Sequence, residues 1–354
     1  MTTFKSKKSK IYVIAGANAA TGGPELLHQL VYNMRDLGFD AYMYYIPYNH
    51  PNPVHPSYKF YKNPYANLIE DKKENILIVP ELYNFIRKFQ DYRNIQKIIW
   101  WLSIDNFFVS RSLNKYPDNI IINLYKLINK IIGIPKFDIH KKAIHLNRKI
   151  SLNNNIFLQK ANIHFAQSNY ALNTLIKLGV NKQDICYLSD YLNDDFLNIK
   201  MTLSNKENIV LYNPAKGYHF ASKIIKNAPD INFVPIQNMN REQVIKLLSK
   251  AKVYIDFGNH PGKDRMPREA AVSGCCIITG KRGSAYNKHD IAIDKKYKFS
   301  DNVKLIPDII RCIHNCINNY ENLIKDFELY RNKILNEKPK FRNDLKNIMT
   351  KIAK

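Results

Sequence analysis

Short apolar runs alternate with amphipathic helical stripes along most of the chain. The run Ile11 to Ala15 is followed by a loop of small residues, Asn18 to Gly23, and a helix is expected to begin at Pro24. This helix carries apolar residues at 3.6-residue spacing and stops at Gly38, before a second apolar run, Ala41 to Ile46. A strand, a helix and a strand in this order form a βαβ unit, which requires a parallel sheet.

The same alternation continues to the C-terminal end of the sequence. It predicts the α/β class with two Rossmann-like domains, since strands that alternate with helices build parallel sheets covered by helices. The further expected strands are Asn75 to Val79, Lys97 to Leu102, Ala161 to Gln167, Ile185 to Leu188, Ile209 to Tyr212, Ile231 to Pro235, Val253 to Phe257 and Cys275 to Thr279. The further expected helices are Asn169 to Leu178, His219 to Asn227, a capped helix after Asn240, and helices from Val303 onward.

The stretch from Tyr254 to Ser284 carries the clearest chemical signal. It reads as a strand, a polar loop, a short helix, a strand and a basic glycine loop. Pro267 suits the first helical position, Glu269 then falls in the first turn, and Gly274 suits the left-handed residue that ends a helix.

Cations and glycines gather at the strand ends of this stretch, and a second set follows an earlier strand. A helix N-terminus and cationic loops at the carboxyl edge of an α/β sheet predict a site for an anion such as a nucleotide diphosphate. The expected donor-binding residues in this half are Lys216, Gly217, Arg265, Arg268, Glu269, Lys281, Arg282, Gly283 and Ser284.

Length and composition fit two globular domains. A chain of 354 residues with 45% hydrophobic residues is too long for one ordinary core and too apolar for disorder. We expect one domain over residues 1–200, a second over 201–335 and a basic helix over 336–354 that crosses back to the first domain. Five cysteines without a paired spacing argue against a disulfide framework or a zinc site.

The chain is strongly basic, with 54 lysines and arginines against 30 aspartates and glutamates. This excess of positive charge bears on binding partners more than on the fold. It fits an anionic lipid surface, nucleic acid or a polyanionic substrate as the partner. A biased base composition of the genome is the alternative explanation. Lys115 to Lys149 combines basic residues with an apolar helical stripe, which fits either a lipid headgroup layer or a helix packed on its own domain. No apolar stretch approaches about 18 residues, and the first apolar run is interpreted as a strand rather than a leader. The expected location is therefore cytoplasmic, with a peripheral contact to the inner leaflet.

Four short motifs, in this order, resemble those of the family-4 type of retaining glycosyltransferases. They are Gly22-Gly23-Pro24-Glu25-Leu26-Leu27, Ser168-Asn169-Tyr170 with its following helix, Asn213-Pro214-Ala215-Lys216-Gly217, and Pro267 to Cys275. The resemblance covers most of the chain except about Pro47 to Glu74 and Lys115 to Asn155. It implies two Rossmann-like domains facing across a cleft, the GT-B architecture. It also implies a nucleotide-sugar donor held mainly by the second domain, an acceptor held by the first, and no metal cofactor.

The same resemblance suggests roles for individual residues. Glu269 would bind the ribose hydroxyls of the donor, Lys216 and Arg265 with Arg268 would bind its diphosphate, and Gly22 and Gly23 would let the backbone approach the donor or the acceptor. The family pattern has two glutamates, and Glu269 matches the later one. The earlier one would stand eight positions before it, where this chain has Pro261. Asp256, His260 and Asp264 are the residues that lie near enough in sequence to substitute for it.

On the acceptor side, Asp105 follows a predicted strand and is the candidate general base, with Glu81 as a second carboxylate of the same kind. An Asx turn or helix cap is the alternative explanation for Asp105.

The sequence therefore predicts a glycosyltransferase that moves a sugar from a UDP- or GDP-sugar to a hydroxyl of a bacterial surface glycan or its lipid-linked precursor. Two alternatives stay open: a CMP-sugar transferase for sialic acid or Kdo, and a nucleic-acid-binding or scaffold protein on a Rossmann-like frame.

Overall fold

The computed structural model describes residues 9–133, 137–199, 201 and 204–352. The basic residues that precede the first strand and the last two residues of the chain lie outside these ranges. The chain divides into two compact units, of which the first comprises Met1–Asp118, Ala143–Asp190 and Pro339–Lys354. The second comprises Asn119–Lys142 and Tyr191–Lys338. Residues 119–142, expected in the N-terminal domain, are thus counted with the second unit, and residues 339–354 with the first.

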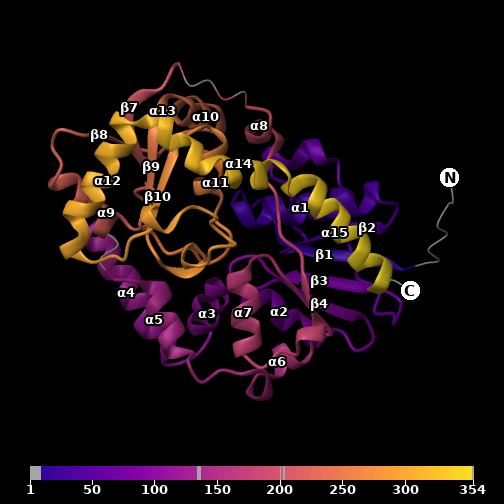
Figure 1. The fold of residues 1–354 in the computed structure, drawn as a ribbon. Helices are drawn as coiled ribbons and strands as arrows, with labels where there is room; N and C mark the ends of the chain where they lie inside the picture. The colour runs from indigo at the N-terminus through magenta and orange to yellow at the C-terminus, as the bar shows by residue number, and fades with distance from the viewer. Residues whose placement is uncertain (1–8, 134–136, 200, 202–203, 353–354) are drawn as a thin grey trace. The chain divides into compact units, whose positions relative to one another are not determined.

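The first unit is built on six parallel strands in the order β2-β1-β3-β4-β5-β6 (Figure 1). Its strands are β1 (Lys10–Gly16), β2 (Asp40–Ile46), β3 (Ile76–Pro80), β4 (Gln96–Trp101), β5 (Ile163–Ala166) and β6 (Ile185–Tyr187). The helices along this part of the chain are α1 (Gly22–Asp36), α2 (Tyr83–Ile86), α3 (Ile104–Leu113), α4 (Asp118–Ile132), α5 (Ile139–Leu146), α6 (Ile156–Gln159) and α7 (Asn169–Lys177). Short 3-10 turns are η1 (Pro56–Tyr61), η2 (Arg87–Asp91), η3 (Leu152–Asn154) and η4 (Lys182–Asp184).

The second unit is built on four parallel strands in the order β10-β9-β7-β8. They are β7 (Glu207–Tyr212), β8 (Asn232–Pro235), β9 (Ala251–Asp256) and β10 (Cys276–Thr279). The helices are α8 (Asp194–Leu197), α9 (Tyr218–Lys226), α10 (Arg241–Lys250), α11 (Arg265–Val272), α12 (Ile306–Asn318), α13 (Tyr320–Leu323) and α14 (Glu328–Leu335), and α15 (Glu337–Ile352) closes the chain. The 3-10 turns are η5 (Gly283–Tyr286), η6 (Lys295–Tyr297), η7 (Val303–Leu305) and η8 (Ile324–Phe327).

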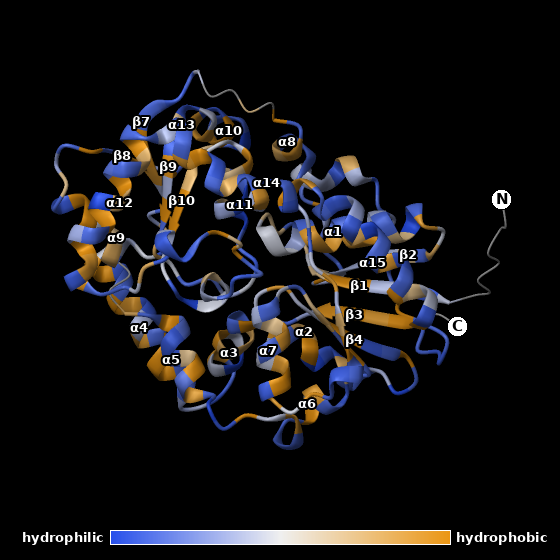
Figure 2. Cartoon of the chain, viewed as in Figure 1, coloured by the Kyte–Doolittle hydropathy of each residue, from blue (hydrophilic) through white to orange (hydrophobic). Residues whose placement is uncertain are grey.

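These two parallel sheets confirm the predicted α/β class and the two Rossmann-like folds. Strands β3 and β10 are coloured as hydrophobic along most of their length in Figure 2, as expected for strands covered on both faces by helices. Trp100 and Trp101 on β4 are both in the core of the first unit. The Trp100 indole donates a hydrogen bond to the carbonyl of Leu188 (3.0 Å), and the Trp101 indole donates to Nδ1 of His164 (3.0 Å).

Two helices begin earlier than the sequence suggested. The first helix, α1, starts at Gly22, so both glycines of the expected loop form its first turn. Helix α11 starts at Arg265 with Asp264 as its N-cap residue, so Pro267 is its third residue and Glu269 lies in the second turn. Gly274 adopts the expected left-handed conformation after α11, with φ +84°. Within the described residues, no helix combines the length and apolar character needed to cross a bilayer.

Candidate functional site

The loops that follow β7, β9 and β10 meet at the carboxyl edge of the second sheet. Gly217 has φ +67°, and a Cβ atom there would lie 2.4 Å from the backbone of Phe257 and Gly258. Only glycine allows the loop after β7 to approach the loop after β9 this closely. Because parallel strands end at the same edge, these loops bring their polar residues into one cluster.

The loop after β10 closes on the same place. Gly283, with φ +58°, would direct a Cβ to within 2.0 Å of the carbonyl oxygen of His260. The Ser284 amide donates to that carbonyl (2.9 Å), and the Ser284 hydroxyl donates to the carbonyl of Gly262. The backbone N–H of Ser284, one of the expected donor-binding residues, is therefore already used within the protein, where it holds the loop after β9.

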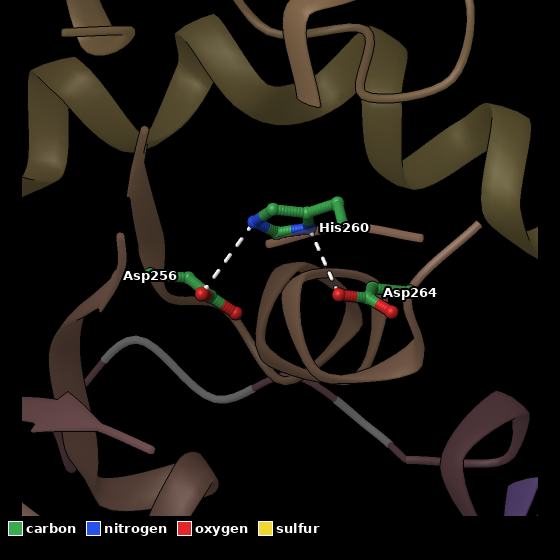
Figure 3. Close-up of side chains that lie close together, drawn as sticks. All are labelled: Asp256, His260 and Asp264. Atoms are coloured by element: carbon green, nitrogen blue, oxygen red, sulfur yellow. Dashed lines mark ion pairs between the residues drawn. The ribbon is translucent and has the colours of Figure 1, made fainter. Parts of the chain in front are cut away.

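A buried imidazole lies at the centre of this cluster, between two aspartates (Figure 3). Nδ1 of His260 is 3.0 Å from an oxygen of Asp264, and Nε2 is 3.5 Å from an oxygen of Asp256. Asp256 also accepts hydrogen bonds from the Tyr254 hydroxyl (2.9 Å) and from the Gly258 amide (2.9 Å). His260 is completely buried and Asp256 nearly so, which removes both as substitutes for the glutamate that Pro261 replaces.

The electrostatics of this cluster favour a charged histidine. Burial by itself lowers the pKa of His260, but the two carboxylates outweigh it and raise that pKa to about 10. Burial acts to raise the pKa of Asp264, and the opposing attraction of Lys216 and His260 holds that pKa well below its usual range. At neutral pH the cluster is therefore an imidazolium between two carboxylates.

Lys216 completes the charge balance of the cluster. Its ammonium lies 3.0 and 3.1 Å from the two oxygens of Asp264, while its side chain remains 40% exposed. Burial acts to lower the pKa of Lys216, but Asp264 and Asp256 raise it overall. Lys216 is thus a charged, partly accessible group that is held by a carboxylate in this structure.

Arg265 and Glu269 lie one helical turn apart at the start of α11, and Nε of Arg265 is 3.1 Å from an oxygen of Glu269. Asp264, which pairs with Lys216, directly precedes Arg265, so both ion pairs involve residues at the N-terminal end of α11. The contacts of Lys216 and Arg265 with a diphosphate stay predictions. The contact of Glu269 with a ribose stays a prediction.

Arg268 has a structural position instead of the expected diphosphate contact. Its side chain is completely buried, its Nη1 lies 2.7 Å from an oxygen of Glu337, and its guanidinium also donates to the carbonyls of Lys263 and Asp264. Lys263 pairs with the same Glu337. The prediction for Arg268 is corrected because all of this charge is used to join α11 to the start of α15.

Arg282 is similarly engaged by the protein. It pairs with Asp138 and with Asp301 (3.0 Å), and it donates to the carbonyl of Phe257 (2.8 Å). Lys281, its neighbour, is exposed. Arg282 therefore braces the loops after β9 and β10, and Lys281 remains available at the surface.

Residues 137–142 add groups that the sequence did not point to. Asp138 pairs with Arg282, and burial lowers the pKa of His140, which also interacts electrostatically with Lys216 and Asp264. These residues lie far from the cluster in sequence, so no local pattern could have indicated them. His260 is different, because an aspartate stands four positions before it and another four positions after it.

The candidate residues of the first unit have mixed outcomes. Asp105 is completely buried in the first turn of α3 and accepts a hydrogen bond from the Tyr170 hydroxyl (2.7 Å), which corrects its expected role as an accessible general base. Glu81 is also buried, and burial raises its pKa to about 7 despite hydrogen bonds from backbone amides that include Leu102. Gly22 and Gly23 form the first turn of α1, where backbone N–H groups have no partner within the helix.

Asp256, His260 and Asp264 are the one group of metal-ligand type found among the described residues, with ligand atoms within 4.8 Å of one another. Their charges are already balanced: two carboxylates face the imidazolium of His260 and the ammonium of Lys216. A divalent cation would have to displace protons or Lys216, so this donor set fits a structural ion network better than a metal centre.

Solved structures with a similar fold include glycosyltransferases and a sucrose-phosphate synthase. The chain matches HepE of Anabaena, solved in complex with UDP-glucose, at a TM-score of 0.59 and 9% identity over 97% of this chain and 100% of that one. It matches sucrose-phosphate synthase of Thermosynechococcus elongatus at 0.62 and 12%, over 98% and 99%. It also matches a glycosyltransferase of Rickettsia africae at 0.61 and 11%, over 98% of both chains.

The chain therefore has the fold of the glycosyltransferases built from two Rossmann-like domains. No family model matches the sequence. Among curated proteins, an alpha-1,6-glucosyltransferase of Actinobacillus pleuropneumoniae serotype 7 is 27% identical over 166 residues, which is 44% of this chain. The match spans about half (48%) of that relative's length.

Proposed function

We propose that this chain is a nucleotide-sugar glycosyltransferase. The observation that carries the proposal is the cluster of Lys216, Arg265 and Glu269 at the carboxyl edge of the second sheet, on a fold shared with glycosyltransferases. A cation pair next to a helix N-terminus is suited to a diphosphate. Lys216 and Arg265 keep accessible side chains there, whereas Arg268 does not.

The chemistry assigned to this cluster is stabilisation of the leaving group. In sugar transfer, the bond between the anomeric carbon and the diphosphate oxygen breaks, and its electron pair leaves with the diphosphate. The oxygen of the acceptor hydroxyl bonds to the same carbon and gives up its proton to the solvent. Negative charge then grows on the diphosphate, and positive groups that are already in place lower the barrier most effectively. Lys216 supplies a point charge and Arg265 a planar fork of donors for the phosphate oxygens.

A uridine diphosphate sugar is the first donor to test. HepE, which shares the fold, was solved with UDP-glucose, and the curated relative is a glucosyltransferase. The acceptor proposed is a hydroxyl of a bacterial surface glycan or its lipid-linked precursor. The comparisons do not favour the CMP-sugar or nucleic-acid-binding alternatives.

The direct experiment is a melting-temperature screen with UDP, GDP, CMP and ADP, followed by transfer assays with the matching sugar nucleotides. A nucleotide present at about 100 times its Kd should raise Tm by about 5 °C, because it binds the folded state alone. Lys216→Ala and Arg265→Ala should remove this rise and lower kcat/KM by at least about tenfold each. The matched controls are Lys226→Ala and Arg311→Ala, at exposed cations of α9 and α12.

The outcomes separate the competing functions. Nucleotide-dependent stabilisation lost in the two site variants and kept in the controls supports the transferase. A rise with CMP alone would favour the CMP-sugar alternative. Undiminished transfer by the double variant Lys216→Ala/Arg265→Ala would contradict the assignment of the site.

We further propose that turnover needs no divalent metal, because His260 and Lys216 already balance Asp256 and Asp264. Transfer rates measured with excess EDTA and with added Mn²⁺ or Mg²⁺ should agree within about twofold. A rate that depends on the added metal, and that disappears in Asp264→Asn, would place a metal in this cluster and overturn the proposal.

We also propose that α4 rests on an anionic membrane. Ile122 faces the protein and is buried, whereas Ile120, Leu124, Leu127 and Ile131 form an exposed apolar stripe with lysines beside it. An amphipathic helix with this composition suits a lipid headgroup layer. Figure 2 shows apolar and polar residues alternating along α4.

Vesicle flotation tests this surface. Leu124→Ser/Ile131→Ser should weaken binding to vesicles that contain phosphatidylglycerol, while Leu329→Ser, at an exposed leucine of α14, should leave it unchanged. Equal flotation of all three proteins would show that α4 does not contact the membrane.

A further inference from the structure

A hollow of about 420 Å³ lies in the first unit, at the amino-terminal edge of its sheet. It is formed where the chain enters β4 and β5, by Gln90, residues 92–97, Lys160 and Asn162. The carboxyl ends of these strands lie at the opposite edge of the sheet, and the cluster around Lys216 belongs to the other unit. We call this space in the first unit the Lys97 hollow. It is separate from the cluster around Lys216.

Lys97 is the unusual residue of this hollow. It is the second residue of β4, and only 8% of its surface is exposed. Its backbone is fixed on both sides by Asn162, whose side-chain oxygen accepts from the Lys97 amide (2.8 Å) and whose amide donates to the Lys97 carbonyl (2.8 Å). Within the described part of the chain, its ammonium has no hydrogen bond or ion pair. Solvent in the hollow reaches this ammonium, so an anionic ligand that enters the hollow can pair with it.

The nearest carboxylate is already used elsewhere. Asp71 accepts hydrogen bonds from the backbone amides of Arg93 (2.8 Å), Asn94 (2.9 Å) and Ile95 (2.8 Å). These bonds fix the loop that lines the hollow and lower the pKa of Asp71. Burial lowers the pKa of Lys97, the charge of Lys160 lowers it further, and Asp71 offsets this only in part.

Three cationic residues line the Lys97 hollow, together with polar and aromatic residues of the kinds that bind a polyol. Arg93 and Lys160 line the hollow with Lys97, and Gln90 and Tyr92 are also among its lining residues. Amides exchange hydrogen bonds with hydroxyl groups, and an aromatic ring packs against the carbon face of a sugar. The volume is within the range of small-molecule sites and larger than a bare phosphate needs.

We infer that the Lys97 hollow binds the phosphate group of a phosphorylated polyol, with Lys97, Lys160 and Arg93 around the phosphate and Gln90 and Tyr92 beside the polyol. A soluble sugar phosphate and the headgroup of a glycerophospholipid share this chemistry. The inference stands on the first unit alone and does not depend on the proposed transferase activity.

Calorimetric titration of the full chain with inorganic phosphate, glucose 6-phosphate and glucose tests the site. Glucose 6-phosphate should bind more tightly than phosphate, and glucose should not bind measurably. Lys160→Met should weaken glucose 6-phosphate binding by at least about tenfold, because one charge-assisted contact is lost. Lys97→Met should weaken it at least as much. Lys182→Met, at an exposed lysine of the same unit, is the matched control.

Phosphate can also bind around Lys216, so the titrations are repeated with Lys216→Ala. Binding that survives Lys216→Ala and is lost in Lys160→Met supports the inference. Binding lost in Lys216→Ala and unchanged in Lys160→Met assigns the phosphate to the second unit and overturns it. Equal binding by every variant, Lys182→Met included, means an adventitious ion only and also overturns it. Lys160 is partly exposed, so this variant keeps the test valid if Lys97→Met fails to fold.

Vesicles distinguish the two sources of the phosphate. If Lys160→Met also loses binding to phosphatidylglycerol vesicles, relative to Lys182→Met, the hollow takes a lipid headgroup. If vesicle binding is unchanged while glucose 6-phosphate binding is lost, the ligand is a soluble sugar phosphate. Both results support the site.

Discussion

At the scale of single residues, His260 is governed by the two carboxylates beside it. Asp256 and Asp264 lie on either side of a completely buried ring and keep it protonated. Asp264 also pairs with Lys216, so one carboxylate contacts both the ammonium and the imidazolium. The site therefore holds an accessible ammonium next to an anion that a diphosphate would have to replace.

The charged state of His260 predicts a pH dependence of stability. Its pKa is about 10 in the folded chain against 6.5 for a histidine in an unstructured peptide, so the stabilisation is complete below pH 6.5 and is lost as the pH rises toward 10. The free energy of unfolding should fall by up to about 1.4 kcal/mol per pH unit in this window. Urea titrations at pH 7 and 9 measure it. The His260→Asn variant should have a lower free energy of unfolding than the wild type at pH 7, and this free energy should fall less between pH 7 and pH 9. An equal fall for the two proteins would contradict a charged His260.

We expect Asp264→Asn to raise the affinity for UDP and to lower the stability of the protein. Removing the carboxylate frees Lys216 for the diphosphate, so UDP affinity should rise a few-fold in calorimetric titrations. The free energy of unfolding should fall by about 1–3 kcal/mol, because His260 loses a charge-assisted contact. Asp308→Asn on α12, which removes an exposed aspartate, is the control. A loss of UDP affinity as large as that of Lys216→Ala would mean that Asp264 positions the lysine rather than competing for it.

At the scale of elements, α11 is positioned by contacts beyond its own sequence. Asp264 is its N-cap residue but turns its carboxylate toward Lys216 and His260, with no side-chain cap hydrogen bond. Arg268 and Lys263 both pair with Glu337, at the first residue of α15. The helix that presents Arg265 and Glu269 is therefore held in place by buried ion pairs to the start of the last helix.

Glu337→Ala should destabilise the protein strongly. It leaves the completely buried Arg268 without its carboxylate, which costs about 3–5 kcal/mol for a buried pair. The triple variant Lys263→Met/Arg268→Met/Glu337→Leu should recover much of this loss, because apolar residues of similar volume remove both unpaired charges. Urea denaturation of the single and triple variants measures both effects. A loss below about 1 kcal/mol in Glu337→Ala would show that the pair does not support α11.

At the scale of the whole molecule, two compact units share one chain that crosses between them more than once. Residues 119–142 are counted with the second unit, and residues 339–354 with the first. Asp138 consequently pairs with Arg282 at the site of the second unit, although 144 positions separate them. The expected division, with boundaries near 200 and 335, included a return of residues 336–354 to the first domain but not the exchange of residues 119–142, which no local pattern marks.

The sequence predicted the elements well where local physics decides them. The strands around Ile14, Ile99 and Ile277 followed from short apolar runs, and the left-handed Gly274 followed from its place after a helix. The starts of α1 and α11 were each placed two residues too late. The two glycines before Pro24 and the two residues before Pro267 were expected in loops, but each pair forms the first turn of its helix.

The sequence by itself determined the α/β class, the strand and helix alternation and the position of cationic loops at strand ends, because periodicity and turn chemistry act over a few residues. Only the tertiary structure decided which of these cations remain accessible. Arg268 and Glu337 are 69 positions apart, and Lys216 and Asp264 are 48 apart. Whether a charge binds a ligand or a partner within the chain depends on which distant carboxylate the fold brings within reach.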